Sequence, residues 1–240
     1  MKINKILVFN IKGKAAHFKK FYSNKSSLTY RIPSRTVLMG MIASILGYSR
    51  DSYYQDLAPD KAKFGLKIIN SGVPHFECMN YLKEDGGHTQ VRLQLLLPKK
   101  DLIKYQIFFT HQNDELFEEL VEKIRQNKFG YGLFFGQRQF RASAEFIKVV
   151  KDVKLLENYQ GRIDTLTFKD NIQKLNLKNQ TKLTVDNLPA SFTKVKSGRE
   201  PEQIVEVCLE EEGRPIDGVF NEVLEVGKEY ISFFTPIVRG

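Results

Sequence analysis

Two amphipathic helical segments set among strand-like runs constrain the fold of this 240-residue chain more than any other feature. The first, Arg35–Leu46, follows Ser34 as a candidate N-cap and ends at Gly47 as a candidate C-cap. Its apolar residues recur at helical spacing and form one stripe: Val37, Leu38, Met41, Ile42, Ile45 and Leu46. A helix with one apolar face must cover another layer of structure.

The second helical segment begins near Asp114, which we expect to be its cap. Its stripe repeats the rhythm of the first: Leu116, Phe117, Leu120, Val121 and Ile124. Strand-like runs flank both helices, at residues 3–11, 63–70, 73–82, 89–97, 105–110 and 143–150. This order predicts an α+β, ferredoxin-like domain over residues 1–150, in which both helices cover one sheet. The surplus strands predict an inserted β-hairpin at about residues 74–97.

Residues 151–240 lack the helical rhythm and predict a smaller, mostly β region. Short strand-like pieces at 193–196, 204–209 and 231–234 alternate with Gly, Pro and Asn turns.

No apolar run approaches the roughly 18 residues of a membrane span, so no membrane contact is expected. The four histidines and two distant cysteines show no metal-ligand spacing, so neither a metal nor another cofactor is expected. Unpaired cysteines are typical of a reducing, cytoplasmic setting.

The positive charge of the chain is concentrated near its beginning. The net charge is +9, yet residues 51–240 carry 27 basic and 28 acidic residues, and the first acid in the chain is Asp51. The loop 12–35 holds seven Lys or Arg, interleaved with Phe and Tyr. Cations bind phosphates and exposed rings stack on unpaired bases, so the loop predicts contact with nucleic acid. A solvated loop remains the better interpretation for any single lysine.

A glycine-rich segment is the second candidate. Gly130, Gly132 and Gly136 lie within seven residues, and Gln137, Arg138 and Arg141 follow them. Glycines let backbone N–H groups approach an anion without obstruction by a Cβ. The spacing fits neither a dinucleotide-binding motif nor a P-loop. A plain turn between helix and strand explains the segment equally well.

These two segments resemble the signatures of the CRISPR-associated "Cas five" family. Residues 21–47 are similar to its opening signature: tyrosine, an aliphatic residue, proline, a Ser/Thr cap, and a helix with an internal glycine that ends in Leu-Gly. Residues 132–140 are similar to its glycine-rich loop. The resemblance covers about residues 1–150, and the form of the loop is most similar to type I-B members.

The resemblance implies a RAMP-superfamily domain in Cascade, the cytoplasmic surveillance complex of type I CRISPR antiviral defense. There the family holds the 5′ handle of the CRISPR RNA and adjoins the backbone subunit and the large subunit, so target DNA is met only through the complex. The hairpin would be its projecting thumb. The candidate RNA-binding residues are Lys19, Lys20, Tyr22, Lys25, Arg31, Arg35, Arg92, Gly132, Gly136, Gln137, Arg138 and Arg141.

One branch of the family cuts precursor RNA with a tyrosine late in the first helix and a Lys-His pair near the second. Here Leu46 occupies the position of that tyrosine, and the second helix begins without a Lys-His pair. We therefore expect a non-catalytic binding subunit. Two alternatives stay open: a metal-independent endoribonuclease using Tyr48 or Tyr22 with His17 or His88, and a generic module for double-stranded nucleic acid.

Overall fold

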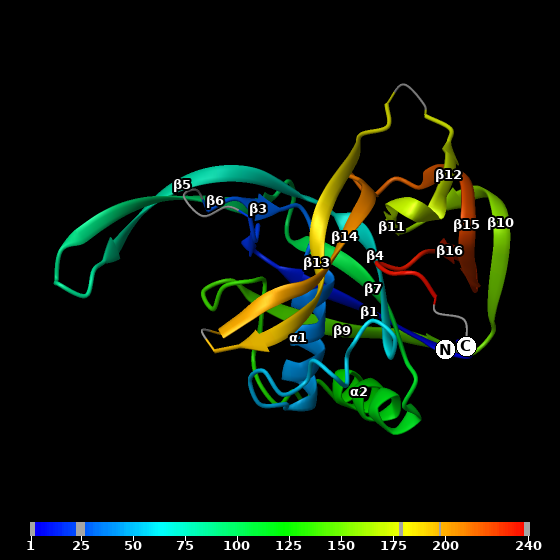
Figure 1. Cartoon of the computed structure of the whole chain (residues 1–240), viewed down its shortest axis with the longest axis horizontal. Helices are drawn as coiled ribbons and strands as arrows, with labels where there is room; N and C mark the ends of the chain where they lie inside the picture. Colours follow the sequence, from blue (N-terminus) through cyan, green and yellow to red (C-terminus); the bar gives the residue numbers. More distant parts are fainter. Residues whose placement is uncertain (1–2, 23–26, 178–179, 197, 238–240) are drawn as a thin grey trace.

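The first part of the chain is built on one five-stranded antiparallel sheet. The computed structural model describes residues 3–22, 27–177, 180–196 and 198–237. The strand order is β4-β7-β1-β9-β8, so β1 is central and β7 lies between β1 and β4 (Figure 1). These strands are β1 (Ile6–Gly13), β4 (Ala62–Asn70), β7 (Ile103–His111), β8 (Leu133–Phe134) and β9 (Arg141–Val150).

Both expected helices are present, as α1 (Arg35–Leu46) and α2 (Asp114–Gln126). Ser34 caps α1 by accepting from the Val37 N–H, and Gly47 ends it with φ 85°. The expected cap of α2 is wrong by one residue: Asn113, whose side chain accepts from two backbone N–H groups, replaces Asp114. None of the helices in the described part of the chain is long and apolar enough to cross a membrane.

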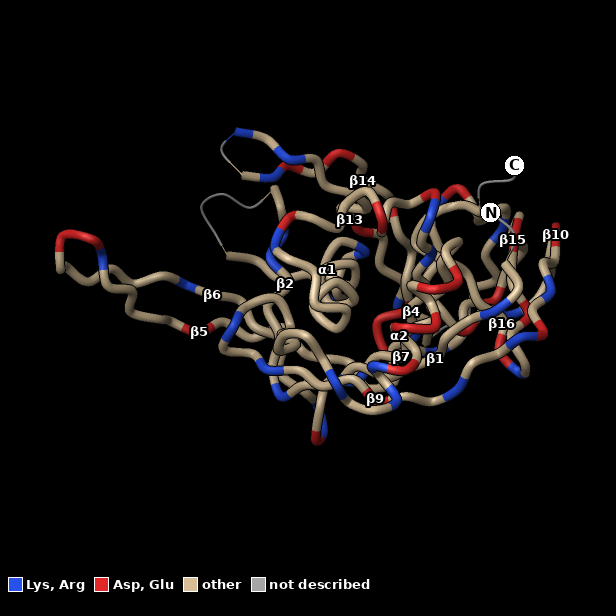
Figure 2. Tube along the Cα trace, turned by 90° about the horizontal axis from the view of Figure 1, so that it is seen from below, with Lys and Arg blue, Asp and Glu red and all other residues tan. Residues whose placement is uncertain are grey.

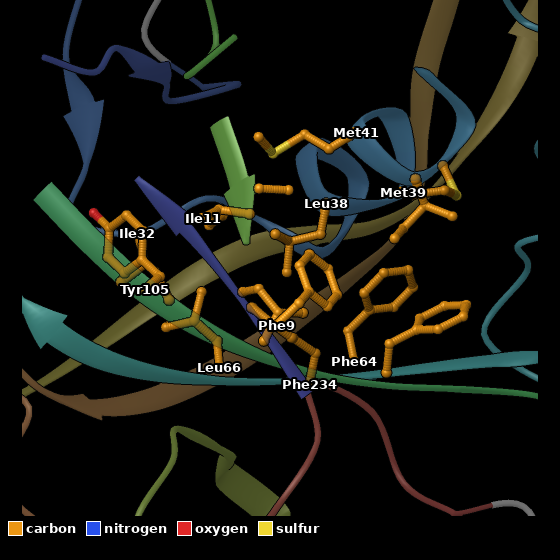
Figure 3. Packing of buried hydrophobic residues seen from close by; sticks show 14 of the residues in the cluster. Phe9, Ile11, Ile32, Leu38, Met39, Met41, Phe64, Leu66, Tyr105 and Phe234 are labelled. Carbon is orange, nitrogen blue, oxygen red and sulfur yellow. The ribbon is translucent and has the colours of Figure 1, made fainter. Parts of the chain in front are cut away.

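The helices and one sheet face share the main core. Figure 3 shows Phe9 of β1 and Phe64 of β4 packed among Leu38 and Met39 of α1. Phe234, near the end of the chain, enters the same cluster. The opposite face of the sheet is covered in part by a second cluster that joins β1 and β7 to the last strands: Ile6, Val8, Phe108, Leu224, Val226, Ile231, Phe233 and Ile237. Residues on either side of position 150 therefore pack together.

A long hairpin projects from this body (Figure 1). It consists of β5 (Gly72–Leu82) and β6 (His88–Pro98), which pair with each other along their whole length. Its base is joined to the basic loop through isolated bridges from Leu96 to Ala16 and from Leu93 to Ser27. The loop itself contains a short ladder formed by β2 (Phe18–Lys19) and β3 (Thr29–Tyr30).

Among the described residues after position 150, the regular elements are strands apart from one 3-10 turn, η1 (Lys169–Asn171). Its strands are β10 (Val153–Ile163), β11 (Thr167–Phe168), β12 (Ile172–Leu175), β13 (Leu183–Val195), β14 (Gly198–Glu210), β15 (Ile216–Val226) and β16 (Glu229–Ile231). They form two sheets, β10-β15-β12 with β16 beside β15, and β11-β14-β13. Strands β13 and β14 are 13 residues each, far longer than the expected pieces at 193–196 and 204–209. We call β13 and β14 the C-terminal hairpin.

Candidate nucleic-acid interface

The basic loop and the glycine-rich segment, about 115 residues apart, lie against each other. The His17 N–H donates to the carbonyl of Phe135 at 3.0 Å. Gly136 has φ 89°, and a Cβ on it would lie 1.9 Å from the His17 carbonyl oxygen. Glycine adopts a φ of this sign readily, whereas residues with a Cβ rarely do. The close approach that demands glycine at this position, however, is to the chain's own backbone.

The glycine-rich segment is also fixed to the end of α1. The N–H groups of Gly130 and Tyr131 donate to the carbonyls of Ile45 and Ser44 at 3.1 and 2.9 Å. A Cβ on Gly130 would lie 2.3 Å from Cα of Gly47, so glycine permits this contact. These bonds satisfy carbonyls that the end of a helix leaves unpaired. Backbone hydrogen bonds thus join the glycine-rich segment to both the loop and the helix.

Between these elements lies a cleft of about 450 Å³. The basic loop contributes Lys19 and Phe21, α1 contributes Val37, Gly40, Met41 and Ser44, and the glycine-rich segment contributes Gly132, Phe134, Gly136 and Gln137. The C-terminal hairpin adds Pro189, Phe192 and Arg199. Among the described residues that line it there are two cations, Lys19 and Arg199, several aromatic rings and no carboxylate. Such a lining suits a phosphate and an unpaired base together.

Several expected RNA-binding residues lie at or near this cleft. Lys19 is exposed and lines it with Gly132, Gly136 and Gln137, and Arg138 is exposed in the same turn. Arg141 lies in a second hollow of about 540 Å³ on the other side of Gly132, together with Tyr131. Arg92 is away from the cleft on the projecting hairpin, with its guanidinium 5.4 Å from the ring centre of Phe76. Lys25 lies outside the described residues.

Other expected residues are engaged within the protein. Lys20 pairs with Asp186 of β13 at 2.6 Å, and Tyr22 donates to the same carboxylate at 3.2 Å. Burial acts to lower the pKa of Lys20, but the bonds to Asp186 and Tyr22 outweigh it and hold the pKa above its ordinary value. Arg31 pairs with Glu211 at 3.1 Å. Two of the seven cations of the loop are therefore paired with carboxylates from the far end of the sequence.

Arg35 corrects the sequence-based expectation. It is 0% exposed, and its guanidinium donates to the carbonyls of Ala190, Leu57 and Ala62 at 2.6, 2.7 and 2.9 Å. Burial lowers its pKa to about 9, which leaves it charged at neutral pH. The sequence places Arg35 among the candidate RNA-binding residues. A side chain so enclosed cannot reach RNA, and it joins α1 to the C-terminal hairpin instead.

The sequence patterns do not predict the C-terminal wall of the cleft. Phe192 and Arg199 lie in the region whose overall charge is close to zero. A local signal was present: residues 187–199 contain Lys194, Lys196 and Arg199 but no acid. Because that stretch gave only a short strand-like piece at 193–196, its cations were not connected with the basic loop.

The uncovered part of the sheet's other face is not a second stacking surface. Cross-strand neighbours there are polar: Asn10 lies opposite Gln106 and Glu145. Lys12 and Lys104 both pair with Glu145, at 3.4 and 3.8 Å. RNA-binding sheets of the RRM type carry aromatic residues on this face. The rings that line the cleft, among them Phe21, Phe134 and Phe192, lie beside α1 instead.

The residues of the catalytic alternative are spread over different surroundings. His17 is buried, and both ring nitrogens are hydrogen-bonded, to the Gln94 carbonyl at 2.7 Å and to Ser27 Oγ at 3.1 Å. Burial lowers its pKa. His88 begins β6 in the projecting hairpin. Tyr48 lines a hollow of about 340 Å³ with His111, whose ring nitrogens are engaged by Asp56 and Asn113. Burial and Asp56 raise the pKa of Tyr48.

Comparison with known proteins decides the family. The family model described as "CRISPR-associated protein (Cas_Cas5)" matches residues 6–199. The chain belongs to this family. No curated protein sequence matches the chain. In the described part of the chain, no group of three or more His, Cys, Asp or Glu residues is placed to hold a metal ion.

Solved CRISPR proteins share the fold of this family member. A CRISPR protein from Archaeoglobus fulgidus is 13% identical, with a TM-score of 0.62 over 95% of this chain and 98% of that one. A chain of a CRISPR RNA-guided surveillance complex is also 13% identical, with a TM-score of 0.55 over 89% and 91%. A chain of a type III-B Cmr-beta complex bound to cognate target RNA is 12% identical, with a TM-score of 0.50 over 89% and 86%.

Proposed function

We propose that this family member is a non-catalytic, RNA-binding subunit of a type I CRISPR surveillance complex, Cascade, and holds the 5′ handle of the CRISPR RNA. The observation that carries the proposal is the cleft, which joins Lys19 and Arg199 to several aromatic rings without a carboxylate among its described lining residues. Cations follow a phosphate backbone and rings accept unpaired bases. The fold shared with a chain of an RNA-guided complex supports the same assignment.

The topology supports a ferredoxin-like core of the RAMP type. The strands β1, β4, β7 and β9 with α1 and α2 follow the split βαβ order, in which β7 separates the parallel pair β1 and β4. In this proposal the β5–β6 hairpin is the thumb, and the chain adjoins the backbone and large subunits of a type I-B complex. The projecting position of the hairpin would let it reach a neighbouring subunit (Figure 1).

The geometry gives little support to RNA cleavage. Transfer of a proton needs a group with a free position near the reacting atoms. The ring nitrogens of His17 and His111 are already engaged by neighbours. Leu46, at the position of the nuclease tyrosine, packs against the main core. A binding role is therefore favoured over endoribonuclease activity.

Competition binding with the purified chain tests this function. A labelled single-stranded repeat RNA should be displaced about tenfold better by unlabelled repeat RNA than by duplex DNA, because the rings need unpaired bases. The same RNA should remain intact during incubation without metal. Equal displacement by duplex DNA would favour the generic module. Specific cleavage that disappears in Tyr48→Phe would establish the endoribonuclease instead.

A further inference from the structure

The outer half of the C-terminal hairpin forms one wall of the cleft. Strand β13 packs along α1, and Pro189 and Phe192 face the cleft from β13 while Arg199 does so from β14. This wall lies beyond residue 150, outside the two segments whose sequence resembles the family's signatures. Its chemistry is nevertheless that of the basic loop: a cation beside aromatic rings.

Arg199 is held in place and still exposed. Its guanidinium lies 5.2 Å from the ring centre of Phe192, and Nη1 is 3.5 Å from Oδ1 of Asp51 and from the hydroxyl of Tyr54. The side chain keeps 44% of its surface accessible. Burial acts to lower the pKa of Arg199, but Tyr54, Tyr53 and Asp51 outweigh it, so the group is fully charged. Contacts of this length orient the cation without enclosing it.

The outer end of the hairpin carries further cations beside the Arg199–Asp51 pair. Lys194 and Lys196 on the same outer end of the hairpin are exposed, and no acid occurs in residues 187–199. Figure 2 shows these basic segments at the end of β13 and β14. Lys19 lies in the cleft lining contributed by the basic loop. Positive charge therefore reaches the cleft from both of these elements, and such an arrangement concentrates phosphate groups between them.

The position of this wall is fixed by the basic loop and α1. The hydroxyl of Tyr30 donates to the Asn187 carbonyl at 2.6 Å, and Arg35 donates to the Ala190 carbonyl at 2.6 Å. Lys20 and Tyr22 bind Asp186. A wall tied at Asp186, Asn187 and Ala190 presents Phe192 at a defined distance from α1. A preorganised wall loses little entropy when a ligand enters.

We propose that the C-terminal hairpin completes the RNA site, with Arg199 holding a backbone phosphate and Phe192 packing against the base of an unpaired nucleotide in the cleft. Phe21 and Phe134 contact that base from the loop and the glycine-rich segment. The inference rests on the proposed function, since it names further residues of the same RNA site. It assigns a role in RNA binding to residues beyond 150.

Salt-dependent binding of the full chain to a labelled single-stranded RNA of about eight nucleotides tests this assignment. Arg199→Gln should reduce the slope of log affinity against log salt by about 0.7, the amount for one phosphate of a single strand. Arg199→Lys should retain the slope of the parent chain. Phe192→Leu should weaken binding about tenfold with the slope unchanged, because a base–ring contact involves no counterion. Phe192→Tyr should bind like the parent.

Two controls separate this inference from the proposed function. Lys174→Gln removes an exposed cation on β12, outside the cleft lining, and should leave affinity and slope unchanged. Thermal unfolding of each variant identifies a loss of RNA affinity that comes from misfolding. If Arg199→Gln or Phe192→Leu misfolds, the conservative variants Arg199→Lys and Phe192→Tyr still test the two contacts. Unchanged binding by Arg199→Gln and Phe192→Leu, while Lys19→Gln weakens it, overturns this inference alone. Failure of the parent chain to bind the RNA overturns both proposals.

Discussion

The basic loop and the C-terminal hairpin contribute to the same cleft but use their charges differently. The loop holds seven cations, yet Lys20, Arg31 and Arg35 bind acceptors in or beside the C-terminal strands. The hairpin belongs to a region with almost no net charge, yet it brings Arg199 into the cleft with much of its side chain exposed. Net charge in a segment therefore locates a site less reliably than the exposure of its individual cations, since Arg199 stays 44% exposed although it pairs with Asp51.

The largest expected effect concerns Arg35. Arg35→Met should lower the free energy of unfolding by about 3 kcal/mol, because three buried carbonyls lose a charged donor. Urea denaturation measures this loss. Lys19→Gln, an exposed cation of the same loop, is the control and should unfold like the parent chain. If Arg35→Met instead kept full stability and reduced the salt slope of RNA binding, the internal role of Arg35 would be refuted.

A smaller effect separates the two cleft glycines. Gly136→Val should destabilise the chain by about 1–3 kcal/mol through its positive φ, with a further cost from the contact with the His17 carbonyl. Gly132→Val should unfold close to the parent, because the nearest obstacle is the movable ring of Phe134 at 3.0 Å. It should weaken RNA binding, since the added side chain occupies the cleft. Equal stability of both variants would show that Gly136 is not required by the loop contact.

The finest comparison concerns two adjacent lysines. Lys19→Gln should reduce the log–log salt slope of RNA binding by about 0.7 with little change in stability. Lys20→Gln should leave the slope nearly unchanged and cost about 1 kcal/mol of stability through the loss of the partly buried pair with Asp186. Asp186→Asn should reproduce that loss of stability. The division of the loop into an RNA-binding part and an internal part would fail if the two lysine variants gave the same slope.

Local sequence signals were sufficient for most of the first 150 residues. Ser34 and Gly47 mark both ends of α1, and the apolar stripe of α2 is buried as expected. The C-terminal strands were harder to foresee. Pro189 and Asn187 lie inside β13, where turn rules predict a break, and an irregularity in the pairing beside Pro189 accommodates the proline. Only the partner strand β14 makes this segment a continuous strand.

The sequence predicted only part of the cleft, because the rest depends on residues far away in the chain. The composition of the loop and the glycines marked two of its walls. Lys20, Arg31 and Arg35 are engaged inside the protein by Asp186, Glu211 and Ala190, respectively. Each of these partners lies more than 150 positions later in the chain. No periodicity within a helix reveals which distant strand will cover its first turn. Arg35 was consequently assigned to RNA, while Arg199 was not considered.

The bond from Arg35 to Ala190 also has a consequence for how the protein is made. The two residues are 155 positions apart, so a ribosome working at 5–20 residues per second needs roughly 8–30 s to supply the acceptor after the donor. If the guanidinium of Arg35 is buried during that interval, it lacks the hydrogen bond to the Ala190 carbonyl, and burying a charge without its partner costs free energy. Until β13 has emerged, the carbonyls of Leu57 and Ala62 are the acceptors that Arg35 has from its described contacts. The contacts of Arg35, in the first third of the chain, are therefore completed only by a residue from the last third.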